Sequence, residues 1–222
     1  MRAVYTFLTL LLLSQAPAAL ARTAYDCFNP ATSGAFLITD DCELSGEVTL
    51  SGDLDILGVV KGDGSYPVVK AASSSRHFTV SGTHKLTLKY LKIIDGDVGS
   101  SGGSIHLQGG KLDISHCVFF NNRAEAGGVL YAEGADNTLD FDSVVFNANH
   151  ATVSSGGALW IHTGVLVEHS CNYTMNTAAA AGGAISLGFW GGSMSSFDSR
   201  FEGNTAVNRG GAIWVHSFNW VT

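Results

Sequence analysis

The sequence predicts an all-β fold, a right-handed parallel β-helix whose coils contain about 27 residues each. Three features recur at the same phase of this period. They are an aromatic residue three positions before an Asn, an Ala two positions after that Asn, and a glycine pair shortly afterwards. Short runs of alternating apolar and polar residues lie between these features and indicate strands with one buried face. Strands that return at one phase of so short a period must stack on one another as a solenoid.

The aromatic-x-x-Asn motif occurs four times. Its asparagines are separated by 27, 27 and 28 residues and are Asn122, Asn149, Asn176 and Asn204. An amide side chain both donates and accepts hydrogen bonds, so we expect these asparagines to form a ladder along the solenoid. We expect the aromatic residues of the motif to stack as a column in the core: Phe119, Phe146, Tyr173 and Phe201.

The glycine pairs indicate tight corners, because glycine adopts positive φ without a steric penalty. They follow the asparagines at 127–128, 156–157, 182–183 and 210–211, and an earlier pair lies at 102–103. A leucine-rich repeat is the alternative, since it has a similar period and an Asn ladder. It requires regularly spaced leucines and often a helical return. Here the segment after each Asn is short, rich in Ala and Gly, and followed directly by a strand.

The N-terminal residues of the chain predict a secreted protein. Residues 1–21 have the features of a secretory signal peptide: a basic Arg2, an apolar stretch over Phe7–Leu13 and a small-residue cleavage site at Ala19–Ala21. A retained N-terminal anchor is the alternative. The repeats are expected to occupy residues 46–222. No polar cap follows the last strand, so we expect either further chain or another covering at that end.

Residues 22–45 are expected to form an N-terminal cap closed by a disulfide. Cys27 and Cys42 lie close together in this segment, and an exported protein can form such a bond. Two free thiols are the alternative. Cys117 and Cys171 occupy the same position of the repeat but lie two coils apart, too far for a disulfide. They are expected to be buried free thiols.

Charge and composition exclude some partners. The net charge of −7 does not favour a nucleic acid, which requires a basic surface. No stretch after the signal is long and apolar enough to predict a transmembrane helix. No cofactor motif is present, so no cofactor is predicted.

The paired motifs resemble the repeat of the polymorphic outer-membrane proteins and related right-handed β-helix repeat proteins. The second motif, Gly-Gly-[Ala/Val]-[Ile/Leu], accompanies the first between residues of about 102 and 214. The resemblance implies a pectin-lyase-like fold and, in bacterial members, an adhesin at the outer membrane. The sequence departs from the pattern at Tyr173, where Phe is usual. Similar repeats also occur in secreted eukaryotic proteins.

One face of the solenoid is a candidate binding surface. In the strand after each glycine pair, alternate residues are apolar and predicted to point inward, so the residues between them point outward. Aromatic and polar side chains that could bind a sugar or a protein recur there: His106, Tyr131, Trp160, His162, Trp214 and His216. The alternative is that these side chains only pack against one another and stiffen the sheet.

A second candidate site is a pair of carboxylates. Asp113 and Asp140 occupy one position of adjacent coils and could support acid–base chemistry on a sugar or bind calcium. The column continues as Val167 and Ser195, and the sequence indicates no basic partner. His162 and His216 are too far apart to predict a zinc site.

These observations favour a secreted or cell-surface, non-catalytic module for adhesion to a polysaccharide or a cell-surface protein. A polysaccharide lyase or glycoside hydrolase of the pectin-lyase-like fold is the alternative.

Overall fold

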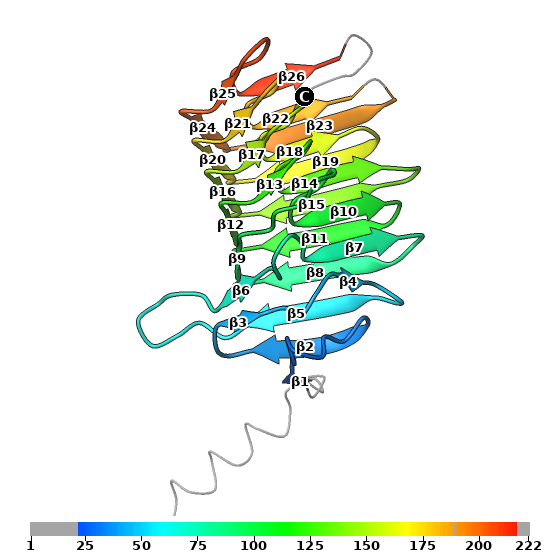
Figure 1. Ribbon diagram of the computed structural model, residues 1–222, viewed down its shortest axis with the longest axis vertical. Coiled ribbons are helices and arrows are strands. Elements are labelled where there is room, and N and C mark those ends of the chain that lie inside the picture. Colours follow the sequence, from blue (N-terminus) through cyan, green and yellow to red (C-terminus); the bar gives the residue numbers. More distant parts are fainter. Residues whose placement is uncertain (1–21, 189, 217–222) are drawn as a thin grey trace, which may run out of the picture.

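The computed structural model describes residues 22–188 and 190–216. This part of the chain contains β-strands joined by turns and loops, and no helix. The strands form four parallel sheets that run along the long axis of the molecule (Figure 1). The predicted signal peptide lies outside the described residues. The predicted parallel β-helix is confirmed.

The sheets are named here by their position in each coil. Sheet A contains β1 (Thr23–Ala24), β2 (Gly34–Ile38), β5 (Leu54–Gly58), β8 (Lys85–Lys89), β11 (Lys111–Ser115), β15 (Thr138–Asp142), β19 (Gly164–His169) and β23 (Gly192–Phe197). Sheet B contains β3 (Cys42–Glu43), β6 (Val68–Lys70), β9 (Lys92–Ile94), β12 (Val118–Phe120), β16 (Val145–Asn147), β20 (Asn172–Thr174) and β24 (Arg200–Glu202).

The other two sheets follow later in each coil. Sheet D contains β13 (Arg123–Ala124), β17 (His150–Ala151), β21 (Thr177–Ala178) and β25 (Thr205–Ala206). Sheet C contains β4 (Val48–Thr49), β7 (Phe78–Ser81), β10 (Ile105–Gln108), β14 (Leu130–Glu133), β18 (Leu159–Ile161), β22 (Ile185–Leu187) and β26 (Ile213–Val215). A complete coil therefore passes through sheets A, B, D and C in turn.

The four repeat asparagines are hydrogen-bonded to one another along the solenoid. The Nδ2 group of Asn122 donates to Oδ1 of Asn149 at 3.0 Å, and that of Asn149 donates to Oδ1 of Asn176 at 2.9 Å. Asn176 donates to Asn204 in the same way, also at 2.9 Å. Each Oδ1 also accepts the backbone N–H of the preceding asparagine at 3.0 Å. The ladder thus binds the corner between sheets B and D of one coil to that of the next.

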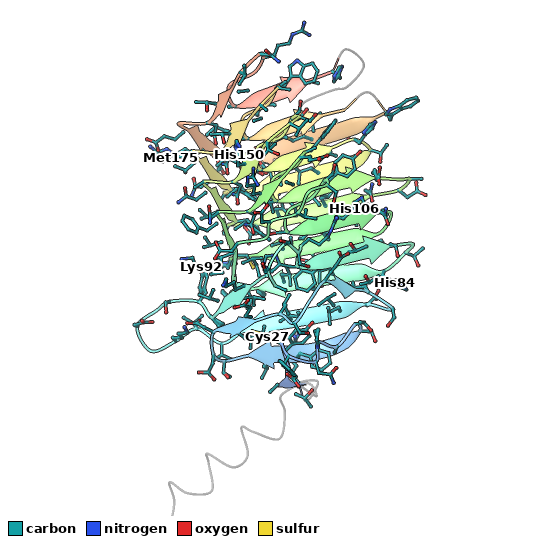
Figure 2. The ribbon with its side chains drawn as sticks, in the orientation of Figure 1. Cys27, His84, Lys92, His106, His150 and Met175 are labelled. Carbon is teal, nitrogen blue, oxygen red and sulfur yellow. A yellow bond between two sulfur atoms is a disulfide. The ribbon has the colours of Figure 1, made fainter. Side chains whose placement is uncertain are left out.

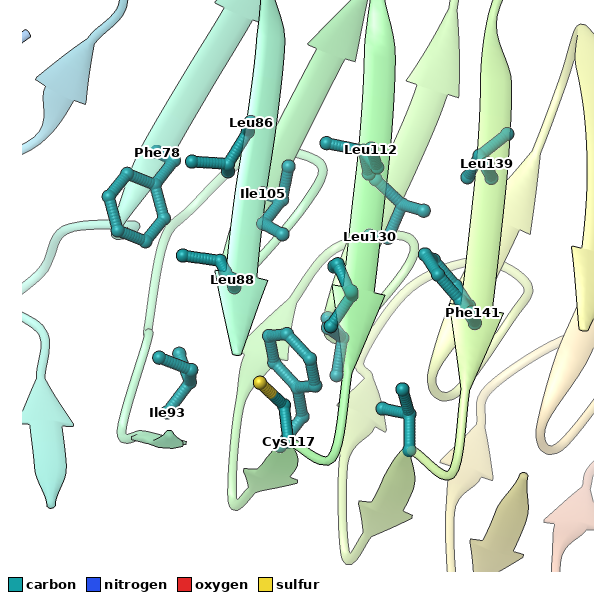
Figure 3. Packing of buried hydrophobic residues seen from close by; sticks show 14 of the residues in the cluster. Phe78, Leu86, Leu88, Ile93, Ile105, Leu112, Cys117, Leu130, Leu139 and Phe141 are labelled. Carbon is teal, nitrogen blue, oxygen red and sulfur yellow. The ribbon is translucent and has the colours of Figure 1, made fainter. Parts of the chain in front are cut away.

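The core contains columns of identical or similar side chains. The rings of Phe146 and Tyr173 are nearly parallel with centroids 4.7 Å apart, and those of Tyr173 and Phe201 repeat this spacing. Leucines of sheet A form a second column, of which Leu86, Leu112 and Leu139 point into the interior (Figure 3). Equivalent positions of neighbouring coils are in register, so one residue type fits the same environment repeatedly.

A carboxylate interrupts this apolar core. Glu168 takes the inward position that Phe141 fills one coil earlier, and it is fully buried. It accepts hydrogen bonds from the hydroxyl groups of Tyr173 and, at 2.8 Å, Ser196. Burial raises the pKa of Glu168, and that of the Tyr173 phenol is also well above its ordinary value. Tyr173 replaces the Phe that is usual at this position of the repeat, and its additional hydroxyl group donates the hydrogen bond to Glu168.

The corners of the solenoid contain left-handed backbone conformations at the glycine pairs and at other positions as well. Gly127 and Gly156 have φ of 60° and 70°, and a Cβ on either would lie about 2.2 Å or less from a backbone carbonyl oxygen. The position directly before the ladder asparagine, and its equivalent Asp95 in the coil before the ladder, is also left-handed. The φ values lie between 54° and 63° in Asp95, Asn121, Ala148, Met175 and Gly203. Only one of these five residues is glycine, so the sequence pattern does not indicate this corner. Met175 projects from the outer edge of the solenoid there (Figure 2).

The cysteines divide as predicted. Cys27 and Cys42 form a disulfide with their Cα atoms 6.1 Å apart. Cys117 and Cys171 are free and buried, and burial raises the pKa of each thiol to about 12. In the segment with the disulfide, β2 pairs with β5 and β3 pairs with β6, so this segment extends sheets A and B.

Candidate ligand-binding face

Sheet C presents a largely aromatic column of side chains on its outer surface. The strand register aligns one position of six successive strands as Thr79, His106, Tyr131, Trp160, Ser186 and Trp214. Their sequence neighbours, such as Leu130 and Ala132, are buried in the core, so this column faces away from it. The next outward column includes Gln108, Glu133, His162 and His216.

We define the aromatic face as the surface formed by His106, Tyr131, Trp160, His162, Trp190, Trp214 and His216. Five of its rings are in continuous contact, beginning with His106, whose ring centroid lies 5.5 Å from that of Tyr131. Tyr131 meets Trp160 edge-on with centroids 5.3 Å apart, and Trp160 stacks on His162 at 5.9 Å. His162 in turn lies nearly parallel to Trp190 at 6.3 Å. The column therefore continues laterally, from the middle of the sheet towards the corner with sheet A.

Trp190 was not predicted as a site residue. It lies between β22 and β23, and its side chain is among the most exposed apolar groups, at 75 %. A groove of about 700 Å³ separates it from corner residues that include Asp136, Thr163 and Val165. An aromatic residue among the Gly and polar residues of these short corners was a signal in the sequence, but Trp190 falls outside the repeat pattern.

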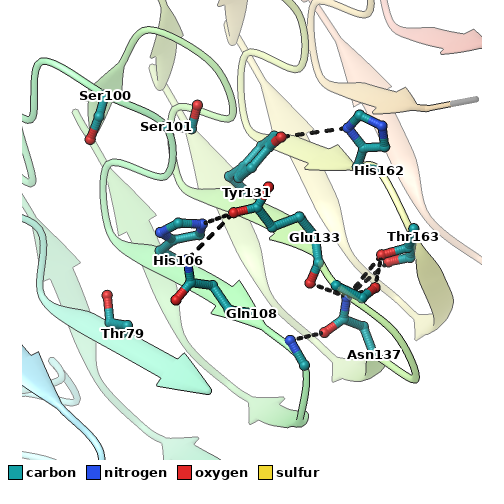
Figure 4. A network of polar contacts seen from close by, with 12 residues as sticks. Thr79, Ser100, Ser101, His106, Gln108, Tyr131, Glu133, Asn137, His162 and Thr163 are labelled. Atoms are coloured by element: carbon teal, nitrogen blue, oxygen red, sulfur yellow. Dashed lines mark hydrogen bonds and ion pairs between the residues drawn. The ribbon is translucent and has the colours of Figure 1, made fainter. Parts of the chain in front are cut away.

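Polar groups are fixed at the other end of the face. The carboxylate of Glu133 lies 2.9 Å from Nε2 of His106 and accepts a longer bond, 3.4 Å, from Nε2 of Gln108 (Figure 4). Burial opposes ionisation of Glu133, but the hydrogen bonds from His106 and Gln108 outweigh it, and the pKa of Glu133 is lowered. Burial, aided by the charge of Glu133, raises the pKa of Tyr131 to about 12. Glu133 is therefore an anionic acceptor and Tyr131 a neutral phenol at physiological pH.

The corner beside Glu133 is held by Asn137. Its Nδ2 group donates to the backbone oxygen of Glu133 at 2.8 Å and to that of Thr163 at 3.2 Å. Its Oδ1 accepts the backbone N–H of Gly109 at 3.0 Å. Asn137 thus joins three coils at the edge of the aromatic face, which fixes the strand ends that carry Glu133 and His162.

Two buried donors in the outward column have no hydrogen-bond partner. They are Nε1 of Trp160 and Oγ of Ser186, which are neighbours in the register of β18 and β22. Ser186 belongs to the outward column, but it is fully buried between the two tryptophans of the column, Trp160 and Trp214. Its small side chain leaves a gap in the aromatic series.

The predicted carboxylate pair is in register on sheet A. Asp113 of β11 lies beside Asp140 of β15, and the column continues as Val167 and Ser195. The expectation that this pair has no basic partner is wrong. Nζ of Lys85 lies 2.6 Å from Oδ2 of Asp113, because β8 places Lys85 one coil below and two residues before the position of Asp113. These groups line a groove of about 460 Å³ on the outside of sheet A.

Residues 22–188 and 190–216 contain no group of three or more His, Cys, Asp or Glu side chains that could hold a metal ion. Nor do they contain a helix of the length and apolarity needed to cross a membrane.

Comparison with known proteins identifies one repeat. Residues 198–216 match the family model of the Chlamydia polymorphic membrane protein repeat. This segment includes Phe201, Asn204 and the pair Gly210–Gly211, so it contains both predicted motifs. No curated protein and no solved structure matches the chain. The match and the stacked parallel sheets support the predicted resemblance to the polymorphic membrane proteins. They point to a β-helix protein of the outer membrane or cell surface, and the disulfide is typical of an extracellular location.

Proposed function

We propose that the protein is a secreted or cell-surface, non-catalytic β-helix that binds a glycan through the aromatic face. The observation that carries this proposal is the continuous row of rings formed by Tyr131, Trp160, His162 and Trp190. Aromatic rings offer large rigid surfaces against which the apolar face of a sugar ring can pack. Exposed apolar surface rimmed by polar groups is typical of a binding site.

The polar surroundings favour a glycan over a protein. Glu133, Gln108 and His106 form a hydrogen-bonded group beside the rings, and Asp136 borders the groove at Trp190. Sugars carry hydroxyl groups around an apolar ring face and therefore need donors and acceptors next to an aromatic surface. The core of a protein–protein interface is instead depleted of charged side chains.

The face also extends over several coils. A parallel β-helix places equivalent positions of neighbouring coils about 4.8 Å apart, so side chains in one column form a regular row. An extended polymer can contact several members of such a row at once. Multiple weak contacts along one chain increase the overall affinity, which suits an adhesin.

Replacement of Trp190 by Ala tests this proposal. Trp190 is largely exposed, so the variant is expected to fold normally and to bind its glycan about 2- to 13-fold more weakly, the loss of one aromatic contact. The ligand would first be found by glycan screening of the secreted protein, and dissociation constants would then be measured by calorimetry. Phe197→Ala is the matched control, because Phe197 is an exposed aromatic residue, 48 % accessible, on sheet A.

Three results would contradict the proposal. The first is equal weakening by the two substitutions, and the second is binding to a protein alone. The third is cleavage of the bound glycan that disappears in Asp140→Asn. It would favour the enzyme alternative, in which Asp140 and the Lys85–Asp113 ion pair form the site.

A further inference from the structure

One asparagine on the outer surface of sheet B belongs to a sequence triplet that the folding pattern does not use. Asn172, Tyr173 and Thr174 are the one place in the sequence where a Thr or Ser stands two positions after an asparagine. This triplet is the acceptor signal for N-linked glycosylation in secreted proteins. The N-terminal residues predict secretion, and the Cys27–Cys42 disulfide is typical of an oxidising secretory compartment.

Strand β20 places both polar residues of the triplet on the outside of the solenoid. Successive residues of a strand point to opposite faces of the sheet. Tyr173 is fully buried in the aromatic column of the core, whereas Asn172 is exposed and Thr174 is half-buried. Transfer of the sugar precedes folding, and the fold must then leave room for a bulky group on the modified nitrogen. An exposed asparagine on the outer face of a sheet meets this requirement.

The side-chain amide of Asn172 is free to carry a substituent. Within residues 22–188 and 190–216 it forms no hydrogen bond, whereas the amides of the ladder asparagines each donate within the ladder or to the backbone. Asparagine is depleted in strands, and the equivalent positions one and two coils earlier are Val145 and Val118. Folding of β20 therefore does not require an asparagine at this position.

From the triplet and this exposure, we infer that Asn172 is the attachment site of an N-linked oligosaccharide. The donor is an oligosaccharide joined to a membrane lipid through a diphosphate, and a transferase of the secretory compartment uses it. The C–O bond between the anomeric carbon and the diphosphate breaks, and a C–N bond forms with Nδ2 of Asn172. Nδ2 loses one proton to a base of the transferase, and the lipid diphosphate leaves. The hydroxyl group of Thr174 completes the signal that the transferase recognises.

The attached oligosaccharide covers a partly apolar region of sheet B. Val145 lies beside Asn172 in the register, and Met175, which is 64 % exposed, directly follows the triplet. Exposed apolar surface promotes association between proteins, and a surface glycan increases solubility. The aromatic face belongs to sheet C, which the chain reaches after sheets B and D, so the attached glycan and the proposed ligand occupy different sheets.

Mass spectrometry of the full chain secreted by cultured eukaryotic cells tests the inference. The wild type is expected to lose mass on treatment with peptide N-glycosidase, which converts the modified asparagine to aspartate, and peptide mapping should locate that change at position 172. Asn172→Gln and Thr174→Ala should each abolish the modification, whereas Thr174→Ser should keep it because the hydroxyl group is retained. Asn147→Gln is the matched control and should remain modified, since Asn147 lies beside Thr174 on sheet B but outside an acceptor triplet.

A secreted wild type that contains the Cys27–Cys42 disulfide but no sugar at Asn172 would overturn the inference, because the disulfide shows that the chain passed through the oxidising compartment. Sugar retained in Asn172→Gln would also overturn it. Sedimentation tests the covering role: Asn172→Gln should self-associate at a lower concentration than the glycosylated wild type, and equal self-association would refute that role. Neither measurement uses a ligand of the aromatic face, so both are independent of the proposed function.

Discussion

Replacement of Asn149 by Leu is the most direct test of the ladder that holds the coils together. The Asn149 side chain is fully buried and forms four hydrogen bonds. Its Oδ1 accepts from the backbone N–H and the Nδ2 group of Asn122, each at 3.0 Å. Its Nδ2 donates to the carbonyl oxygen of Phe119 at 3.1 Å and to Oδ1 of Asn176 at 2.9 Å.

The expected loss follows from the groups that remain. Asn176 Oδ1 still accepts the backbone N–H of residue 149, and Asn122 Nδ2 still reaches the carbonyl oxygens of Ile93 and Phe120. The backbone N–H of Asn122 has no replacement. One stranded buried donor costs about 1–3 kcal/mol, and each other lost bond about 1 kcal/mol, part of which the apolar leucine offsets. We expect the free energy of unfolding to fall by about 3 kcal/mol.

Chemical unfolding monitored by circular dichroism measures this change, and the melting temperature should fall by about 6–12 °C. Asn147→Leu is the control, since Asn147 is an asparagine of the same coil that is only partly buried. A variant at position 149 as stable as the control would show that the ladder does not stabilise the solenoid, and the reasoning would be refuted.

Two further predictions concern positions that break the repeat pattern. Glu168→Gln should match the wild type near pH 4 and be more stable at neutral pH. Burial raises the folded-state pKa of this carboxyl above 4.5, so the stability of the protonated form is fully present below that value and lost as pH rises through the folded pKa. Melting curves across this range check it. Burial lowers the pKa of His77 to about 4, but this group titrates in both proteins, so its effect cancels in the difference between their stabilities. A stability difference between Glu168→Gln and the wild type that does not change with pH would contradict the prediction. Met175→Gly should raise the free energy of unfolding by about 0.5–1 kcal/mol, because a side chain at φ of 54° is strained and this one is 64 % exposed. Gly203→Ala, at the same corner one coil later, should have the opposite sign in chemical unfolding, and equal signs would exclude strain as the cause.

The sequence predicted those parts of the fold that repeat at identical positions. The ladder asparagines, the glycine pairs and the free cysteines could be placed because each coil imposes the same environment on the same column. The left-handed corner before the asparagine could not, since Asn121, Ala148 and Met175 share no property that would reveal it. The backbone of the neighbouring coils imposes that conformation regardless of side chain.

Contacts between residues of different columns could not be predicted from the sequence either. Glu168 and Tyr173 are both departures from the repeat, but they belong to different sheets. Their relation appears only when β19 and β20 fold around the same core. Lys85 was missed as the partner of Asp113 because it lies in an early coil that lacks the asparagine signal. Trp190 was missed because a corner loop has no fixed position in the period.

The two kinds of column explain where function can reside in such a solenoid. An inward column favours similar residues in successive coils, because each side chain packs against its equivalents above and below, and the change from Phe141 to Glu168 requires hydroxyl partners in the core. For this reason an aromatic ring recurs at one inward position in four successive coils, and this recurrence carries no information on a ligand. The residues are Phe119, Phe146, Tyr173 and Phe201. An outward column has no such requirement, since solvent accepts any polar residue. The large rings on sheet C pack against one another, and the proposed binding of an extended ligand along the column would give them a second role.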